Sequence, residues 1–148
     1  MPVKIIDKIE LIEFDKWKTH YIKYLIFNKN KVSQKNIINL WKWLTNKKHP
    51  SNIIIAIYKN DIVGHIHYKF LSNPVRGKNI GFIDDIYIDK KYRKSGIAKK
   101  LIKHLLKIGK KNKWDVIRWN CDMQNDKAIN FYLKFSKILQ WHTFELQV

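Results

Sequence analysis

The stretch that decides the fold reads YRKSGIAKKL and occupies residues 92–101. Four of its ten residues are basic, none is acidic, and Gly96 stands between the two pairs of charges. A β-branched apolar run, IGFIDDIYI (80–88), precedes it, and apolar residues at helical spacing follow over 96–111. A helix N-terminus presents unpaired N–H groups and a positive dipole end. We therefore expect this loop, between a strand and a helix, to bind an anion such as a phosphate group.

The segments around this stretch show the same two periodicities. Helical spacing of apolar residues and short β-branched or alternating runs predict helices at 15–27, 33–44, 96–111 and 125–135, and strands at 53–58, 62–71, 80–88, 116–120 and 138–146. Helices come first, a strand hairpin next, and alternating strands and helices last. This order predicts an α/β fold with a mixed, mostly antiparallel central sheet flanked by helices. With no linker or repeat, residues 1–148 are expected to form a single domain.

The chain is strongly basic, with a formal net charge of +18 from 30 Lys and Arg against 12 Asp and Glu. Part of this excess reflects genome composition, because lysine, isoleucine and asparagine share A/T-rich codons. The distribution is more informative: residues 90–113 carry eleven Lys and Arg and no acid. A positive field on one segment favours an anionic ligand there, whether nucleotide, phosphate or nucleic acid.

The number of cysteines and the hydropathy of the chain help to predict the cellular compartment of the protein. The single Cys121 excludes a disulfide framework, and no uncharged apolar run approaches the roughly 20 residues of a membrane helix. The start, MPVKIIDKIE, lacks the apolar stretch of a signal peptide. We expect a cytoplasmic protein with no membrane partner.

Two well-known phosphate-binding loops do not fit the stretch. The P-loop pattern G-x-x-x-x-G-K-[ST] is absent, and only one glycine of the dinucleotide pattern G-x-G-x-x-G can be placed, at Gly96. An ordinary basic turn that ends in glycine would look the same, so the loop alone leaves both interpretations open.

A wider pattern extends from the loop through FIDDIYIDKKYRKSGIAKKLI (82–102) and RWNCDMQNDKAINFY (118–132). It resembles the GCN5-related N-acetyltransferase (GNAT) superfamily. The residues that carry the resemblance are Asp85, Tyr87, Ile88, Arg93, Gly96, Ala98, Asn125, Ala128 and Tyr132. WKTHYIKYLIF (17–27) and HPSNIIIAIYKNDIVGHIHY (49–68) look like the Hpa-type branch, to which the diamine acetyltransferases look related. The likeness covers nearly the whole chain.

Two positions depart from the family pattern. Lys94 stands where the family often has the first glycine of the loop, and LKFSKIL (133–139) lacks the glycine–aromatic pair that usually follows the tyrosine.

The resemblance implies acetyl-CoA as the acetyl donor. Backbone groups of one strand would contact the pantetheine arm, the basic loop would hold the pyrophosphate, and the next helix would line the groove. The residues implied for these roles are Ile86, Tyr87, Ile88, Arg93, Lys94, Ser95, Gly96, Ile97, Ala98, Lys99, Asn125, Ala128 and Tyr132.

The same resemblance implies N-acetyl transfer to an amine, directly within a ternary complex. Tyr132 is the expected proton donor to sulfur, although an aromatic residue on an amphipathic helix is more often part of the core. Asp84 and Asp85 are the candidate bases and acceptor ligands, and Asp84 matches the glutamate of the diamine enzymes. Trp119 and Asn120 are expected beside the acceptor. Small amines, polyamines, amino acids and protein lysines all stay open as acceptors, and a homodimer is a further expectation.

Strand alternation places the two aspartates on opposite faces. Asp84 is expected on the face that carries Ile80, Phe82 and Ile86, and Asp85 on the face that carries Ile83 and Tyr87.

Three other patterns compete with this interpretation. His65 and His67 share a strand face, but no third metal ligand is evident, so we expect no metal. Cys121 has no neighbouring histidine to activate it as a nucleophile. Trp114 and Trp119, near the lysine-rich helix, could stack on bases, and a basic single-stranded nucleic-acid-binding module is the alternative function.

Overall fold

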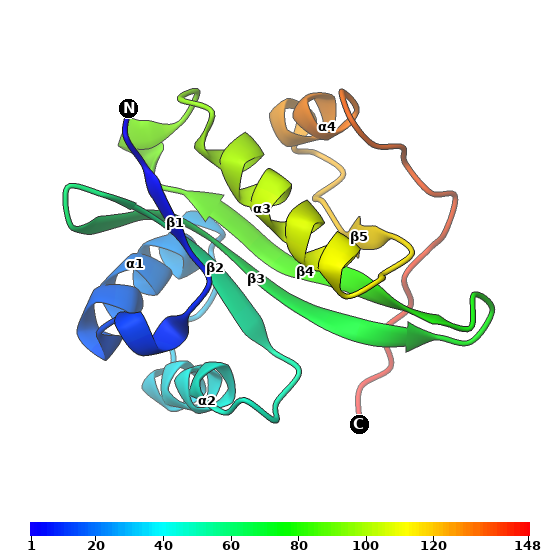
Figure 1. The fold of residues 1–148 in the computed structure, drawn as a ribbon, viewed down its shortest axis with the longest axis horizontal. Helices are drawn as coiled ribbons and strands as arrows, with labels where there is room; N and C mark the ends of the chain where they lie inside the picture. The colour runs from blue at the N-terminus through cyan, green and yellow to red at the C-terminus, as the bar shows by residue number, and fades with distance from the viewer.

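The computed structural model describes residues 1–148 and places five strands in one sheet, in the order β1–β2–β3–β4–β5 (Figure 1). The strands are β1 (Lys4–Ile6), β2 (Asn52–Tyr58), β3 (Asp61–Asn73), β4 (Lys78–Ile88) and β5 (Ile117–Trp119). The first four pair antiparallel, and β5 joins β4 in parallel. The sheet is therefore mixed and mostly antiparallel, as the sequence predicts.

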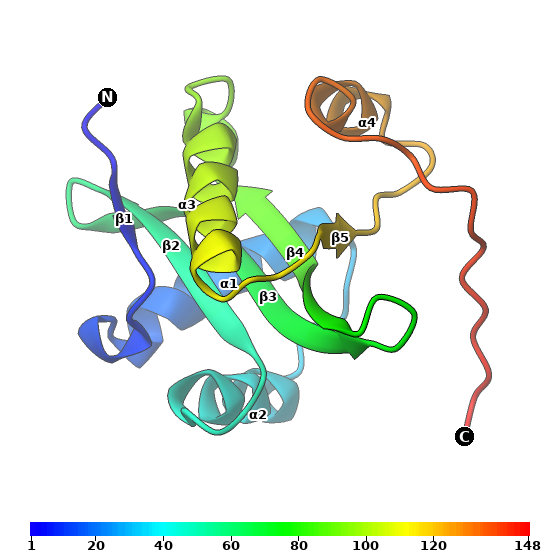
Figure 2. The same ribbon diagram turned by 45° about the vertical axis from the view of Figure 1, so that its right-hand side comes forward.

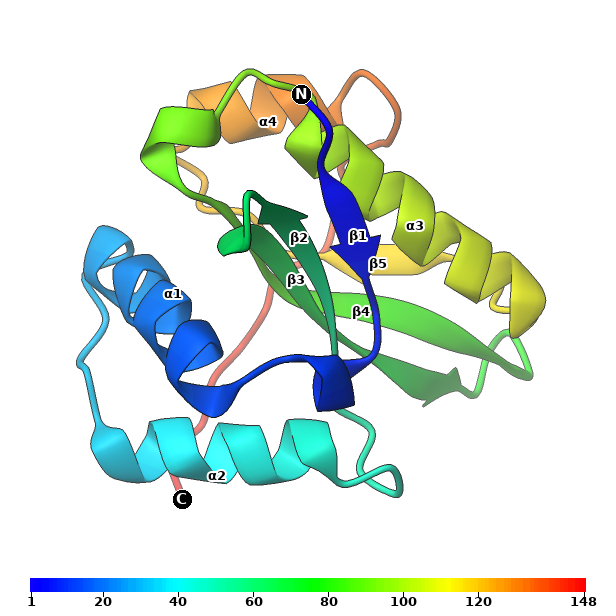
Figure 3. The same ribbon diagram turned by 60° about the vertical axis from the view of Figure 1, so that its left-hand side comes forward.

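Helices cover both faces of the sheet. They are α1 (Phe14–Phe27), α2 (Gln34–Thr45), α3 (Ile97–Lys111) and α4 (Asp126–Tyr132), with short 3₁₀ turns η1 (Ile9–Leu11) and η2 (Lys90–Tyr92). Figure 3 shows α1 and α2 on one side of the sheet and α3 and α4 on the other. No helix combines the length and the apolar character that a membrane span requires.

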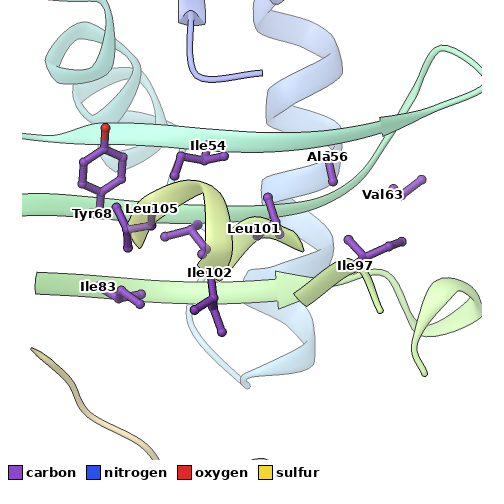
Figure 4. Packing of buried hydrophobic residues seen from close by; sticks show 10 residues of the cluster. Ile54, Ala56, Val63, Tyr68, Ile83, Ile97, Leu101, Ile102 and Leu105 are labelled. Atoms are coloured by element: carbon purple, nitrogen blue, oxygen red, sulfur yellow. The ribbon is translucent and has the colours of Figure 1, made fainter. Parts of the chain in front are cut away.

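The alternation of β2 divides the core into two layers. Ile53 and Ile55 pack with Trp17 and the other apolar residues of α1 and α2, while Ile54 faces α3. The α3 layer contains four of the five positions of the predicted apolar stripe, Ile97, Leu101, Ile102 and Leu105 (Figure 4). The fifth, Ile108, is partly buried against this layer. Because both faces of the sheet are covered, β2 reads in sequence as a continuous apolar run rather than as an alternating one.

The predicted strand at 138–146 is wrong. The chain after α4 has no regular secondary structure and runs outside the sheet (Figure 2). Trp141 and Phe144 are 80% and 92% exposed. An alternating sequence forms a strand only where an edge offers hydrogen bonds and an apolar face, and β5 has just three residues. The short β1 was not predicted, since three residues are too few for a periodic signal.

Trp114 fixes how α3 returns to the sheet. Its indole ring lies against Gly81 of β4 and Gly109 of α3, and its centroid is 6.1 Å from that of Tyr68. Side chains at the two glycines would compete with the ring for this space.

We expect Gly81→Ala to lower the free energy of unfolding by about 1–3 kcal/mol, because a β-carbon there would lie 2.7 Å from two Trp114 ring atoms. Gly109→Ala is the matched control. Its closest approach is 3.1 Å, and alanine adds about 1 kcal/mol of helix propensity. Urea titration measures both variants, and equal losses would contradict this packing.

Candidate active site

The C-terminal half of β4 has a free edge. β3 pairs with β4 from Lys78 to Ile88, whereas the parallel ladder with β5 covers only Gly81–Ile83 opposite Ile117–Trp119. Backbone groups of Asp84–Ile88 on the β5 side therefore have no strand partner. An extended ligand can bind along such an edge with main-chain hydrogen bonds. Three of the residues expected at the cofactor, Ile86, Tyr87 and Ile88, lie in this segment.

A β-bulge lies where this free edge begins. His67 of β3 pairs with Asp85, while the next residue, Tyr68, pairs with Ile83. Asp84 is therefore an extra residue in β4 that has no pairing partner in β3. A bulge bends its strand and increases the local twist, which accounts for the end of pairing with β5 at this position.

The bulge also overturns the expected faces of the strand. Simple alternation predicts Ile83 and Asp85 on one face, but Ile83 packs in the α3 layer while Asp85 contacts His65 and His67 on the α1 side. Asp84 does not lie on a buried apolar face. Its carboxylate is 2.6 Å from Lys69 Nζ, and both side chains are 33% exposed. The buried carboxylate of this strand is Asp85, not Asp84.

The basic loop offers a row of unused backbone donors. Gly96 has φ +81° and caps α3, and Lys94 has φ +60°, so both residues are left-handed. Lysine thus adopts the turn that the family usually builds with glycine, at a cost of about 1–2 kcal/mol. The backbone N–H groups of Lys94–Lys99, which include Ser95, Ile97 and Ala98, donate to no protein acceptor. This arrangement suits phosphate oxygens.

Arg93 is held by the protein rather than directed to solvent. Its Nε donates to the carbonyl of Ile88 at 3.0 Å, and its guanidinium lies 4.2 Å from the ring centroid of Phe27. Arg93 therefore ties the loop to the end of β4 and to α1. The lysines and backbone N–H groups are the freer anion ligands.

The Asn125–Tyr132 motif comprises α4 and its N-cap, on the same side of the sheet as α3 (Figure 3). The side chain of Asn125 accepts a hydrogen bond from the N–H of Ala128 at 3.2 Å, so the spacing is that of a helix cap. Tyr132 packs edge-on against Trp119 at 5.3 Å between ring centroids, and Asn120 follows β5 as an exposed residue. Burial, aided by Cys121, raises the pKa of Tyr132 to about 12, so its hydroxyl keeps its proton at neutral pH.

Beneath α1, Asp85 joins three buried histidines. Its Oδ1 lies 2.6 Å from His65 Nε2 and 2.8 Å from His67 Nδ1. His65 Nδ1 is 3.0 Å from His20 Nε2, and the indole nitrogen of Trp17 is 3.4 Å from His67 Nε2. Burial alone would raise the pKa of Asp85, but His67 and His65 together hold it well below its usual range.

The indole N–H determines the tautomers of this network. Trp17 can only donate, so His67 Nε2 must accept and Nδ1 must carry the proton given to Asp85. Burial lowers the pKa of His65, which as a neutral ring donates from Nε2 to the carboxylate. His65 Nδ1 then accepts from His20, whose own Nδ1 is buried without a partner.

The expectation that His65 and His67 lack a third metal ligand is wrong, because Asp85 supplies one: the three ligand atoms lie within 4.8 Å of one another. The tautomers nevertheless oppose metal binding. A metal on His67 Nδ1 would move the ring proton to Nε2, which would then face the N–H donor of Trp17. The cluster fits a hydrogen-bonded carboxylate better than a metal centre.

Sequence reasoning missed the contribution of α1 to this region. Tyr21 packs perpendicular to His67 with ring centroids 5.2 Å apart, and Tyr24 packs perpendicular to His65 at 5.5 Å. Both tyrosines lie on the apolar stripe of a predicted helix, which explains them without any role in a site. The sequence signal that could have indicated a site was the presence of two tyrosine hydroxyl groups and a histidine, His20, on the core-facing side of this helix.

The comparisons with known proteins agree with this geometry. The model of the acetyltransferase (GNAT) family matches residues 14–136. The chain belongs to the GNAT acetyltransferase family. A search of curated protein sequences found no significant match.

Solved structures share the fold of this GNAT acetyltransferase. A ribosomal-protein-alanine N-acetyltransferase from Brucella melitensis biovar Abortus 2308 has TM-score 0.82 at 19% identity, with 100% of both chains covered. An aminoglycoside acetyltransferase from an uncultured soil metagenomic sample has TM-score 0.81 at 21% identity, covering 99% of this chain and 97% of the other. A Trypanosoma brucei acetyltransferase has TM-score 0.74 at 17% identity, covering 99% and 100%. At sequence identities this low, the structural similarity establishes only that the fold is shared.

The buried histidines should make this GNAT acetyltransferase sensitive to acid. Burial lowers the pKa of His20 to about 2 and also lowers that of His65, whereas both titrate near 6.5 in the unfolded chain. Below about pH 6.5 the unfolded state therefore binds more protons. As the pH decreases below this value, the free energy of unfolding should fall by about 1.4 kcal/mol per pH unit for each of the two histidines.

Urea titrations between about pH 7 and pH 5 measure this slope. His20→Asn should flatten it, and His142→Gln, in the exposed C-terminal segment, should leave it unchanged. An unaltered slope in His20→Asn would show that His20 is protonated in the folded protein.

Proposed function

We propose that this acetyltransferase takes acetyl-CoA as donor and transfers its acetyl group to a primary amine within a ternary complex. The observation that carries the proposal is the row of free N–H groups at Lys94–Lys99, next to the unpaired edge of β4. The loop would bind the pyrophosphate, and Ile86–Ile88 would give main-chain hydrogen bonds to the pantetheine arm. Asn125 and Ala128 would line the opposite wall of the groove.

Direct transfer needs a neutral amine, a polarised thioester carbonyl and an acid for the leaving thiolate. The amine nitrogen would form the new C–N bond, the C–S bond would break, and the thiolate would take the proton of the Tyr132 hydroxyl. Asp84 would accept the amine proton through water, since its carboxylate is exposed at the bulge. Trp119 and Asn120 would border the acceptor.

A covalent acetyl-enzyme is not favoured. Burial and the neighbouring Asp122 raise the pKa of the Cys121 thiol, so little thiolate is present at neutral pH. The thiol contacts the carbonyl of Asp122 rather than a histidine. Without a base to activate it, this cysteine is a poor nucleophile.

The nucleic-acid alternative loses its stacking platform. Trp114 is packed against Gly81 and Gly109, and Trp119 is packed against Tyr132. Both indoles are partly buried against the α3 layer of the core, so the charge of that helix is the main feature in favour of a binding module.

Three finer expectations belong to this proposal. They are membership of the Hpa-type or diamine branch, a homodimer, and a cytoplasmic location. None is needed for the chemistry above.

Gly96→Asp should abolish the rise in melting temperature that acetyl-CoA or CoA produces, because it adds negative charge among the anion ligands. A β-carbon at Gly96 would meet nothing within 4 Å, so the fold should persist. Gly77→Asp is the matched control, with φ +58° and equally open space in the β3–β4 turn. If single-stranded nucleic acid stabilises the wild type and acetyl-CoA does not, the nucleic-acid-binding module becomes the better supported function.

Tyr132→Phe should keep cofactor binding and lower kcat by about 10²–10⁴-fold, because only the proposed proton donor is lost. Tyr58→Phe, which removes a hydroxyl from β2, is the control and should turn over normally. Steady-state rates and CoA binding are measured together. A Tyr132→Phe enzyme with the wild-type rate would assign this ring to packing alone.

A further inference from the structure

The outward face of α3 carries six lysines and no acidic residue. Helical spacing places these lysines opposite the side of α3 that packs on the sheet. They are Lys99, Lys100, Lys103, Lys107, Lys110 and Lys111, and every one is exposed. Figure 3 shows α3 on the side of the sheet away from α1 and α2. The exposure of all six lysines shows that no other part of the chain covers this face.

None of these lysines pairs with a carboxylate. The basic residues that do form such ion pairs all lie outside 90–113, and they are Lys23, Lys69, Arg76 and Lys78. The one carboxylate that contacts a side chain of α3 is that of Asp7, which lies 2.9 Å from His104 Nε2. Genome composition can raise the lysine content of the whole chain, but it does not account for the exclusion of acids from this face.

The row of lysines is unfavourable for the helix itself. Lys99, Lys103, Lys107 and Lys111 follow one another at intervals of four residues. Like charges at this spacing destabilise a helix by about 0.2–0.5 kcal/mol per pair. The first turn of α3 has no acid to offset them, whereas the first turns of α1 and α4 each contain an aspartate.

The helix dipole explains only part of this charge. Cations stabilise a helix near its C-terminus, which accounts for Lys110 and Lys111. Near the N-terminus the dipole disfavours cations, so Lys99, Lys100 and Lys103 lie at unfavourable positions. An external anion would relieve both the dipole repulsion and the mutual repulsion of the lysines.

A polyanion with regularly spaced charges complements such a row. The lysines extend over about 18 Å of helix axis, and a nucleic-acid duplex carries one phosphate per roughly 1.7 Å. Lysine contacts phosphates as a point charge and reads no base sequence. Trp114 and Trp119 are partly buried against the α3 layer, so aromatic stacking on unpaired bases does not favour a single strand.

The distal lysines of α3, which are Lys103, Lys107, Lys110 and Lys111, lie apart from the loop proposed to hold the pyrophosphate. Lys107 is about 16 Å along the helix axis from Gly96. A polyanion on the distal lysines therefore leaves the backbone N–H groups of Lys94–Lys99 free for the cofactor.

We infer that the distal lysines dock the protein on the phosphate backbone of a duplex nucleic acid, independently of its base sequence. This interaction goes beyond the proposed acetyltransferase function, because it gives the enzyme a second, polyanionic partner. The duplex is a docking partner and not the acetyl acceptor.

The test compares binding of a fluorescently labelled duplex of about 20 base pairs, roughly three times as long as α3, by the wild type and by a charge variant. Fluorescence anisotropy is measured between about 50 and 200 mM salt. The variant Lys103→Gln/Lys107→Gln/Lys110→Gln should bind at least about 10-fold more weakly at the lowest salt, and its log–log salt slope should be smaller by about 2–3.

A matched control removes the same charge from the other side of the sheet. Lys42→Gln/Lys47→Gln/Lys48→Gln changes three exposed lysines in and after α2, and its slope should change by less than about 1. If both triple variants weaken binding equally, the duplex responds to net charge alone and the inference fails. If the wild type shows no binding at about 50 mM salt, the inference also fails.

Three further ligands identify the partner. A single strand of the same sequence should bind more weakly than the duplex, and tighter binding would indicate base stacking and overturn the inference. A polyglutamate peptide that binds as tightly as the duplex would assign the face to an acidic protein instead. Saturating CoA should leave the duplex bound, whereas complete displacement would place the duplex on the basic loop.

The α3 variant should remain folded and active. Lysine and glutamine have similar helix propensities, and the substitutions relieve repulsion, so its melting temperature should equal or exceed that of the wild type. Its stabilisation by acetyl-CoA should persist, since none of the three lysines belongs to the loop. Loss of duplex binding with an intact response to acetyl-CoA separates this inference from the proposed function.

Discussion

Strand β4 holds one extra residue in its pairing with β3, and much of the candidate active site depends on the register shift that this residue causes. Opposite His67 and Tyr68, β4 inserts Asp84, so that the strand bends and changes its alternation. The bend coincides with the end of the β4–β5 ladder and leaves an unpaired edge. The changed alternation turns Asp85 toward the histidines and leaves Asp84 beside Lys69. A single insertion thus accompanies both the unpaired edge of β4 and two different carboxylates.

The two carboxylates differ because their surroundings differ. Asp85 lies under α1, where hydrogen bonds from two histidines offset the cost of burying a charge. Asp84 lies at the surface, where water and a lysine compensate it at little cost. Neighbours in sequence therefore lie in different environments: Asp85 is a nearly buried carboxylate held by histidines, and Asp84 is a surface carboxylate paired with a lysine.

The basic loop at Lys94–Lys99 depends on tertiary structure less than the two aspartates do. Its form follows from residues close together in the chain: left-handed Lys94 and Gly96 direct the loop into α3, and no acceptor competes for its N–H groups. Tertiary structure contributes mainly the position of the loop. Arg93 connects it to Ile88 and Phe27, so the donors lie next to the open edge of β4.

Local pattern was sufficient for those elements whose sequence carries a strong period. The apolar stripe of α3, the continuous apolar run of β2, the glycine loop and a helix starting near Asn125 could all be predicted, because each depends on residues within a few turns or strand positions. The tertiary structure decided what depends on partners distant in sequence. A bulge is visible only in the register between two strands, and Asp85 met its histidines only through that register. The 138–146 segment alternates like a strand but has no edge long enough to pair with. The tautomer of His67 was fixed by Trp17, fifty residues away in the chain, because a donor-only indole leaves the ring a single arrangement.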